Sequence, residues 1–172
     1  MPAPPDPVEA LISAWETELP DVLGPSSELS KRLMVLSGEL GAATRRELTA
    51  FGLTAAEFDV LATLRRSGAP HRMKPNELSR SLLLSSGGTS NVINHLVAGG
   101  LVEREPDPDD GRSTLIRLTA AGITRAEEAV RAVAAAHEDL FAGVPAEVLR
   151  TATEALRELH AARTKKKTSM HA

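Results

Sequence analysis

The segment from Lys74 to Gly122 constrains the fold of this 172-residue chain more than any other stretch. Pro75 opens a first helix, because proline is favoured at the first helical position. Ser85 suits the N-cap of a second helix. Two strands then follow, at 101–105 and 113–118, and enclose the loop Pro-Asp-Pro-Asp-Asp-Gly-Arg. The order helix, turn, helix, strand, loop, strand predicts a winged helix-turn-helix.

The second helix of this segment has two kinds of face. Side chains at helical spacing predict the face that packs inward, namely Thr89, Val92, Ile93 and Leu96. The other faces carry short hydrogen-bonding side chains that suit bases or phosphates, namely Ser86, Ser90, Asn91, Asn94 and His95. Asn91 and Asn94 suit bidentate contact with adenine. Gly87 and Gly88 either let backbone N–H groups approach phosphates closely or are simply tolerated in the first turn. The alternative for the whole stretch is an ordinary core helix.

Arg112 stands at the end of the predicted hairpin loop. An arginine in this position can enter the narrow minor groove of DNA while the second helix reads the major groove. Asp110, two residues earlier, would orient the guanidinium group. The alternative is a solvent-exposed turn whose acids only stabilise the chain reversal.

Three stretches of this segment, LSSGGTSNVINHL, GLVEREPDPDDGRS and LTAAG, resemble the MarR family of transcriptional regulators. The family pattern D-x-R…L-T-x-x-G is met by Asp110, Arg112, Leu118, Thr119 and Gly122. The resemblance implies a homodimer that binds a pseudo-palindromic operator and releases it when a small molecule or an oxidant arrives. Two recognition helices related by a two-fold axis predict half-sites about 10 base pairs apart.

The charge distribution indicates where double-stranded DNA would bind. The formal net charge of −3 argues against a protein that coats nucleic acid indiscriminately. A basic patch nevertheless precedes and enters the winged segment, and consists of Arg65, Arg66, Arg72, Lys74 and Arg80 against the single acid Glu77. Arg72 and Lys74 are therefore predicted to contact DNA, with affinity that depends on two half-sites being engaged together.

The composition excludes several functional classes. The chain has no cysteine, which excludes disulfides, thiolate metal sites and thiol-based redox sensing. No nucleophile–base pair, P-loop or dinucleotide fingerprint is present, so neither an enzyme nor a cofactor is expected. His137, Glu138 and Asp139 point around a helix and do not converge, so no metal site is expected. Without a long apolar run or a signal-peptide pattern, the chain is expected to be cytoplasmic and not membrane-bound.

The flanking sequence predicts helices on both sides of the winged segment. The N-terminal region, 1–53, is predicted to hold two helices for dimerisation and one wall of a ligand pocket. DNA binding is assigned to 54–122, which opens with the capping box Thr54-x-x-Glu57. Apolar helices in 123–163 need a partner and are predicted to dimerise, and 164–172 is predicted to be a disordered basic tail. The fold class is mainly α with a small antiparallel β wing.

Trp15 and Asp59 suggest where a ligand would bind. The urate-responsive branch of the MarR family has an extra N-terminal helix with a Trp, an Asp that corresponds to Asp59, and an Arg in the recognition helix. Val92 stands at the position of that Arg, which removes a charge-assisted contact to an oxyanion. The resemblance therefore predicts a pocket near Trp15 and Asp59 that binds a phenolic or apolar ligand more readily than urate. The alternative places Trp15 in the core.

The sequence thus predicts a homodimeric repressor released from its operator by a small ligand. One competing hypothesis is a ligand-binding or protein-interaction module that keeps the winged fold and has lost DNA binding. It would be favoured if the polar face from 86 to 95 and Arg112 were buried. An enzyme would require acids or histidines that converge in a cleft.

Overall fold

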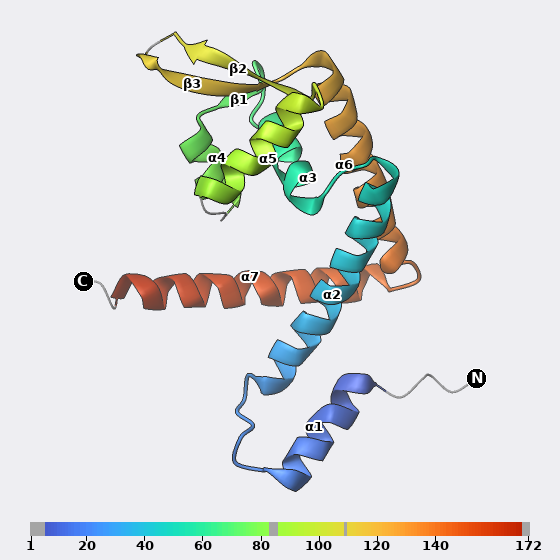
Figure 1. The fold of residues 1–172 in the computed structure, drawn as a ribbon. Helices are drawn as coiled ribbons and strands as arrows, with labels where there is room; N and C mark the ends of the chain where they lie inside the picture. Colours follow the sequence, from blue (N-terminus) through green and yellow to red (C-terminus); the bar gives the residue numbers. More distant parts are fainter. Residues whose placement is uncertain (1–5, 83–85, 109, 170–172) are drawn as a thin grey trace. The chain divides into compact units, whose positions relative to one another are not determined.

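The computed structural model describes residues 6–82, 86–108 and 110–169. They form mainly helices with one small antiparallel sheet (Figure 1), which confirms the predicted fold class. The chain divides into two compact units, residues 1–137 and 138–172. The regions predicted as 1–53 and 54–122 therefore share one unit. The elements are α1 (Pro7–Glu18), α2 (Ser27–Ala50), α3 (Ala55–Arg66), β1 (Arg72–Met73), α4 (Pro75–Leu82), α5 (Ser86–Ala98), β2 (Val102–Asp107), β3 (Asp110–Leu118), α6 (Ala120–Leu140) and α7 (Ala146–Ser169).

Side-chain caps fix the starts of several helices, among them the predicted capping box at Thr54. The carboxylate of Asp6 accepts from the Val8 backbone N–H over 2.9 Å at the start of α1. At α3, Thr54 Oγ1 accepts from the Glu57 N–H over 3.2 Å, and Glu57 Oε2 accepts from the Thr54 N–H over 2.8 Å. Each such bond satisfies a backbone donor that has no partner inside the helix.

The sheet has the strand order β1-β3-β2, with β3 in the centre. A two-stranded wing is predicted from the sequence. Instead, Arg72 pairs with Arg117 and Met73 with Ile116, which adds a third antiparallel strand. β2 and β3 also extend further toward the hairpin loop than predicted, and the register shifts between Pro106 and Asp107.

One apolar core joins α5 to the rest of the winged segment. It is built from α3, α4, α5, the sheet and the start of α6, and comprises Val60, Leu61, Leu64, Leu78, Ile93, Leu96, Val102, Ile116, Leu118 and Ala126. Thr89 is also buried, as predicted. Val92 packs against this core, so its side chain contributes to packing. The position of α5 is therefore set by buried side chains, which leaves its other faces outside.

A close backbone contact fixes the junction between the sheet and α6. Gly122 is buried in the first turn of α6, and a Cβ placed on it would lie 1.9 Å from the Leu101 carbonyl oxygen. The same oxygen accepts from the Thr119 backbone N–H over 3.1 Å. Thr119 Oγ1 in turn accepts from the Gly122 N–H over 3.0 Å, so Thr119 caps α6. The last position of the L-T-x-x-G motif thus requires glycine for steric reasons.

The N-terminal helices leave large apolar side chains exposed. Arg32 on α2 bonds to Asp6 over 2.6 Å and ties the start of α1 to α2. Trp15 is 45% exposed, so the alternative that placed it in the core is wrong for this chain by itself. Other exposed apolar residues on α1, directly after it and on α2 include Leu11, Leu19, Leu29, Met34, Val35 and Leu36.

The C-terminal helix α7 belongs to the second unit and also carries exposed apolar side chains, including Val148, Leu149, Leu156 and Leu159. Its backbone is helical as far as Ser169. The sequence instead predicts a disordered tail from residue 164, because three successive lysines suggest a solvated segment. Among the described residues, no helix combines the length and apolar character needed to cross a membrane.

Candidate nucleic-acid interface

The outer face of α5 is polar and exposed. Ser90, Asn91, Asn94 and His95 are all exposed, as predicted, while Ile93 and Leu96 on the opposite face are buried. This pattern leaves four hydrogen-bonding side chains accessible on adjacent turns of one helix. The exposure counts against the hypothesis of a winged module whose polar face has been buried.

The start of α5 is described only in part. Ser85, predicted as the N-cap, lies outside the described residues. The helix begins at Ser86, so Ser86 and Gly87 have helical backbone, and Gly88 is half-buried. Ser79 on α4 donates to Thr89 Oγ1 over 2.9 Å, which links the two helices of the motif beneath the outer face.

Arg72 and Lys74 are engaged by acids of the wing. Arg72 Nη1 bonds to Glu105 Oε1 over 2.8 Å, and Lys74 Nζ bonds to Asp107 Oδ2 over 2.8 Å. The hydrogen bond from Arg72 lowers the pKa of Glu105, and the bond to Asp107 raises the pKa of Lys74. Asp107 is only 4% exposed. These two cations therefore stabilise the attachment of β1 to the hairpin, a role that the sequence does not reveal.

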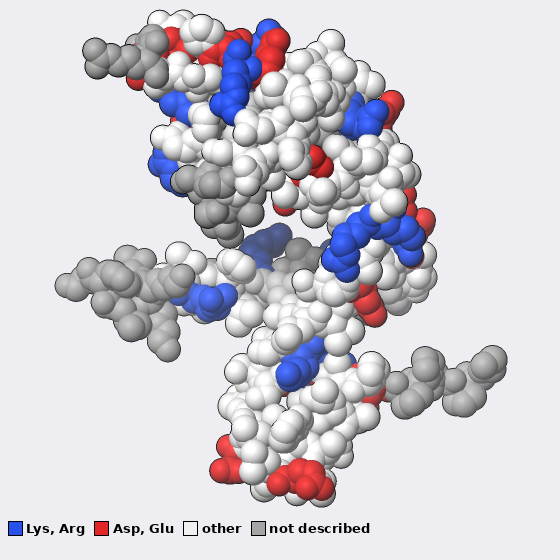
Figure 2. All heavy atoms as spheres, viewed as in Figure 1, with Lys and Arg blue, Asp and Glu red and all other residues white. Residues whose placement is uncertain are grey.

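Arg117, not predicted as a functional residue, extends this cluster of charges. It forms ion pairs with Glu103 and with Glu105, the latter over 2.8 Å. Figure 2 accordingly shows Lys and Arg interspersed with Asp and Glu over the strands, at the upper left of that view. The base of the wing is a set of balanced ion pairs.

The tip of the wing places Asp110 and Arg112 at the start of β3. Ser113 Oγ donates to Asp110 Oδ2 over 2.7 Å, so this carboxylate holds the turn of the hairpin. The side chain of Arg112 lies outside the described set. The predicted minor-groove contact of Arg112, and its orientation by Asp110, therefore stay predictions.

Arg104 on β2 contacts the outer face of α5. Its Nη2 atom donates to Asn94 Oδ1 over 2.8 Å. On the same helix, His95 Nδ1 lies 3.9 Å from Glu57 Oε1. Sequence reasoning missed Arg104, because its partner is ten positions away on a different element. The only available signal was its place between two acids on a predicted strand.

Trp15 lines a cavity of about 390 Å3 between α1 and the start of α2. Its other lining residues are Leu19, Val22, Leu23, Ser26, Ser27, Ser30 and Lys31. Asp59 lies on α3 and is not among them, so a ligand pocket shared by Trp15 and Asp59 stays a prediction. Asp59 is exposed, yet desolvation by the atoms packed around it raises its pKa, and Arg66 partly offsets that rise.

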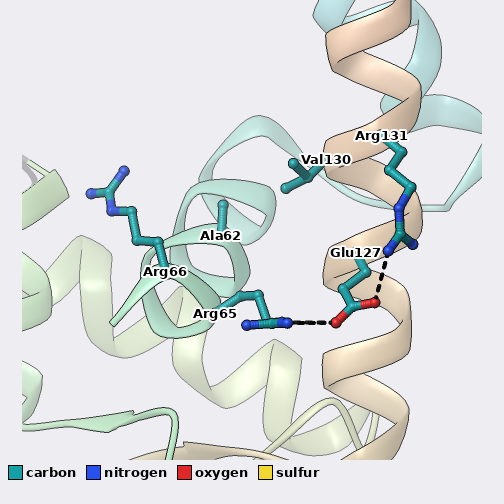
Figure 3. Close-up of a pocket in the computed structure, with 6 residues that line it drawn as sticks. All are labelled: Ala62, Arg65, Arg66, Glu127, Val130 and Arg131. Atoms are coloured by element: carbon teal, nitrogen blue, oxygen red, sulfur yellow. Dashed lines mark hydrogen bonds and ion pairs between the residues drawn. The ribbon is translucent and has the colours of Figure 1, made fainter. Parts of the chain in front are cut away.

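A second hollow, of about 270 Å3, lies between α3 and α6. Figure 3 shows Glu127 between Arg65 and Arg131, with Ala62 and Val130 facing each other beside it. Arg65 bonds to Glu127 over 2.7 Å, and Arg131 bonds to the same carboxylate over 3.1 Å. Both bonds lower the pKa of Glu127, and the bond from Arg65 contributes most. This ion-paired group clamps α3 to α6, and Figure 3 shows Arg66 directed away from it.

The described histidines and acids form no group that could hold a metal ion. His137, considered above beside Glu138 and Asp139, lies 2.8 Å from Thr44 Oγ1 through its Nε2 atom. That contact joins α2 to α6, so within the described chain the residue has a structural partner.

Comparison with known proteins identifies the family. A sequence model of the MarR family matches residues 51–113, from the end of α2 to the start of β3. The HTH-type transcriptional regulator PecS of Dickeya dadantii (strain 3937) is 30% identical over 116 residues, which span 67% of this chain and 70% of PecS. The chain belongs to the MarR family. The relation to the urate-responsive branch, and with it the assignment of an extra N-terminal helix, stays a prediction.

Solved structures share the fold, and two of them were determined with a bound partner or ligand. A cysteine-to-serine mutant of MarR from E. coli, complexed with operator DNA, has a TM-score of 0.66 at 25% identity, over 84% of this chain and 96% of that one. CouR from Rhodococcus jostii RHA1, bound to p-coumaroyl-CoA, has a TM-score of 0.65 at 26% identity, over 78% of this chain and 92% of that one. The protein is a MarR-type transcriptional regulator with a DNA-binding winged helix, and not a member of an enzyme family.

Proposed function

We propose that this MarR-family chain is a homodimeric repressor that binds a pseudo-palindromic operator and leaves it when a small ligand binds. The exposed polar face of α5, with Ser90, Asn91, Asn94 and His95, is the observation that carries the DNA-binding part. Short amide and hydroxyl side chains on an exposed helix suit the donor and acceptor pattern of the major groove. The solved MarR–operator complex supports the same use of the fold.

The homodimer is supported by the exposed apolar side chains of α1, α2 and α7. A soluble monomer rarely tolerates apolar surface on this scale, and two-fold dimers are the commonest closed assembly. A dimer would also place two α5 helices on one face of a duplex, about 10 base pairs apart.

Selection of binding sites from random duplexes tests the operator proposal. The expected result is a palindrome with half-sites about 10 base pairs apart, bound by two chains in sedimentation equilibrium. In the free protein, a concentration-independent monomer at micromolar protein would contradict the dimer. Selection of no sequence, or of a single asymmetric half-site, would contradict the proposed mode of DNA binding.

The effector is the finer part of the proposal. We expect it at the Trp15 cavity, whose apolar lining and Lys31 suit an aromatic or phenolic compound with an anionic group. The CouR structure supports small-ligand binding on this fold. A ligand can release DNA only if it binds the DNA-incompetent state more tightly.

Titration of Trp15 fluorescence tests the effector site, because Trp15 is the only tryptophan. Phenolic and carboxylate compounds are compared with urate, first with protein alone and then with operator present. The expected effector perturbs the fluorescence and also releases DNA. Release without any change in fluorescence would place the site elsewhere. Quenching and release by micromolar urate would contradict the argument from Val92.

A further inference from the structure

The amide of Asn94 is held by the wing. Arg104 Nη2 on β2 donates to Asn94 Oδ1 on α5 over 2.8 Å, and both side chains are exposed. The helix and the hairpin, the two elements expected to meet DNA, are thus connected by a side-chain hydrogen bond on the accessible side of the molecule.

Strand alternation explains why Arg104 is available for this bond. Successive side chains of a strand point to opposite faces. On β2, Glu103 and Glu105 share one face, where both form ion pairs with Arg117. Arg104 lies between them and points to the other face, toward α5. Within the described part of the chain, no ion pair of Arg104 competes with its bond to Asn94.

The chemistry of the pair determines how the amide is oriented. Arginine has only donors, whereas an asparagine amide has an acceptor end and a donor end. The acceptor Oδ1 of Asn94 must therefore face Arg104, and this contact fixes which end of the amide is oxygen and which is nitrogen. The Nδ2 group, with its two N–H donors, must point away from Arg104.

We propose that Arg104 is a specificity-determining positioning residue, which holds Oδ1 of Asn94 and so presents the amide N–H groups to acceptor atoms of an operator base. This inference rests on the proposed operator binding. In the major groove guanine offers only acceptors, O6 and N7, whereas cytosine offers the N4 donor. Asn94 held in this way favours guanine over cytosine. Bidentate pairing with adenine is then no longer its preferred contact, because Oδ1 is already engaged.

The first experiment examines the free protein by NMR and needs no DNA. The side-chain amide signals of Asn94 are compared between the native chain and Arg104→Ala. Loss of the bond should shift these signals and lower their heteronuclear NOE, because the amide gains motion. The amide of Asn91, exposed on the same helix, is the matched reference and should not change. Identical Asn94 signals in both proteins would overturn the proposal.

The second experiment measures base preference on the selected operator. Each half-site position is changed to all four bases, and affinities are measured for the native chain, Arg104→Ala, Arg104→Lys, Asn94→Ala and the double variant. One symmetric position should favour guanine over cytosine by roughly five- to tenfold. Arg104→Ala and Asn94→Ala should each lose that preference. The double variant should lose no more, because coupled residues are not additive. Arg104→Lys, also a donor only, should retain part of it.

The outcomes separate a positioning role from a plain charge effect. Equal weakening on every duplex by Arg104→Ala would make Arg104 a phosphate contact and overturn the proposal. An unchanged preference would also overturn it. Arg46→Ala, on the exposed surface of α2, is the control for loss of one positive charge and should leave the preference intact. If the native chain selects no duplex, the proposed function and this inference both fail, and the NMR result still shows whether the bond exists.

Discussion

Replacement of Gly122 by alanine tests the close contact between α6 and the preceding turn. The added Cβ would lie 1.9 Å from the Leu101 carbonyl oxygen and 2.9 Å from its carbon. Because both are backbone atoms, neither can rotate out of the way. Either the first turn of α6 or the turn after α5 must move by about 1 Å before the contact becomes tolerable.

The expected loss of stability follows from three contributions. Overpacking costs about 1–3 kcal/mol, and the upper end applies because the obstacle is backbone. The movement also weakens the hydrogen bond from the Thr119 N–H to the Leu101 oxygen, which contributes about 1 kcal/mol. The higher helix propensity of alanine offsets about 1 kcal/mol of this loss of stability. We therefore expect Gly122→Ala to lower the free energy of unfolding by about 3 kcal/mol.

Urea and thermal unfolding measure this loss, at one fixed protein concentration because the stability of a dimer depends on it. For a chain of this length the melting temperature should fall by roughly 6–12 °C. Gly38→Ala is the matched control, since Gly38 lies inside α2 and a Cβ there would meet no atom of the chain within 4 Å. Gly38→Ala should raise the free energy of unfolding by up to about 1 kcal/mol. A loss below about 1 kcal/mol for Gly122→Ala, or equal effects of the two changes, would refute the reasoning.

Three further predictions follow from the described contacts. The pKa of Glu127 is lowered from 4.5, so the stability from its ion pairs is present above about pH 4.5 and is lost as pH falls through the lowered value. The melting temperature of Glu127→Gln should therefore fall less on acidification than that of the native chain. Lys74→Ala should lower the melting temperature more than Arg80→Ala, because the buried Asp107 loses its ammonium partner. Equal melting temperatures of the two variants would contradict a stabilising role of the Lys74–Asp107 ion pair. Arg112→Ala should weaken operator binding by about 1–3 kcal/mol if it reads a base edge, with an unchanged melting temperature; unchanged affinity would remove the wing tip from the mechanism.

The sequence predicted those parts of the fold that depend on short-range chemistry. The capping box at Thr54 involves residues three positions apart, so the pattern of residue types reveals it. The buried and exposed faces of α5 were also predicted, because helical periodicity is local. The same holds for the start of α4 at Pro75.

The parts that the sequence did not predict depend on contacts between distant positions. β1 has only two residues, and it is a strand only because β3, more than forty residues later, provides its partner. The DNA contacts of Arg72 and Lys74 stay predictions, but their ion pairs were not predicted, because their acids, Glu105 and Asp107, are likewise remote in sequence. A count of charges along the chain cannot show which of them are paired in space.

For the candidate site, the sequence predicted the exposed polar face of α5 but not the contacts that its side chains make. Asn94 was expected to contact a base, but its hydrogen bond to Arg104 depends on the packing of β2 beside α5. A pocket shared by Trp15 and Asp59 stays a prediction from the resemblance, and the cavity that the described chain forms beside Trp15 is lined by α1, α2 and the turn between them. Lining residues are set by helix packing, which a single sequence specifies least directly.

The balanced ion pairs at the base of the wing affect how the proposed complex should respond to ionic strength. Each phosphate neutralised by a free cation releases condensed counterions and steepens the fall of affinity with salt, by a slope of about 0.9 per contact. Arg72, Lys74 and Arg117 are already paired with Glu105, Asp107 and Glu103. Because their charges are already neutralised by these acids, they should release fewer counterions on binding DNA. The affinity for DNA should therefore fall only slightly as the salt concentration rises. Hydrogen bonds from α5 to bases would then carry a larger share of binding, and discrimination between sequences should persist in salt that removes most non-specific association.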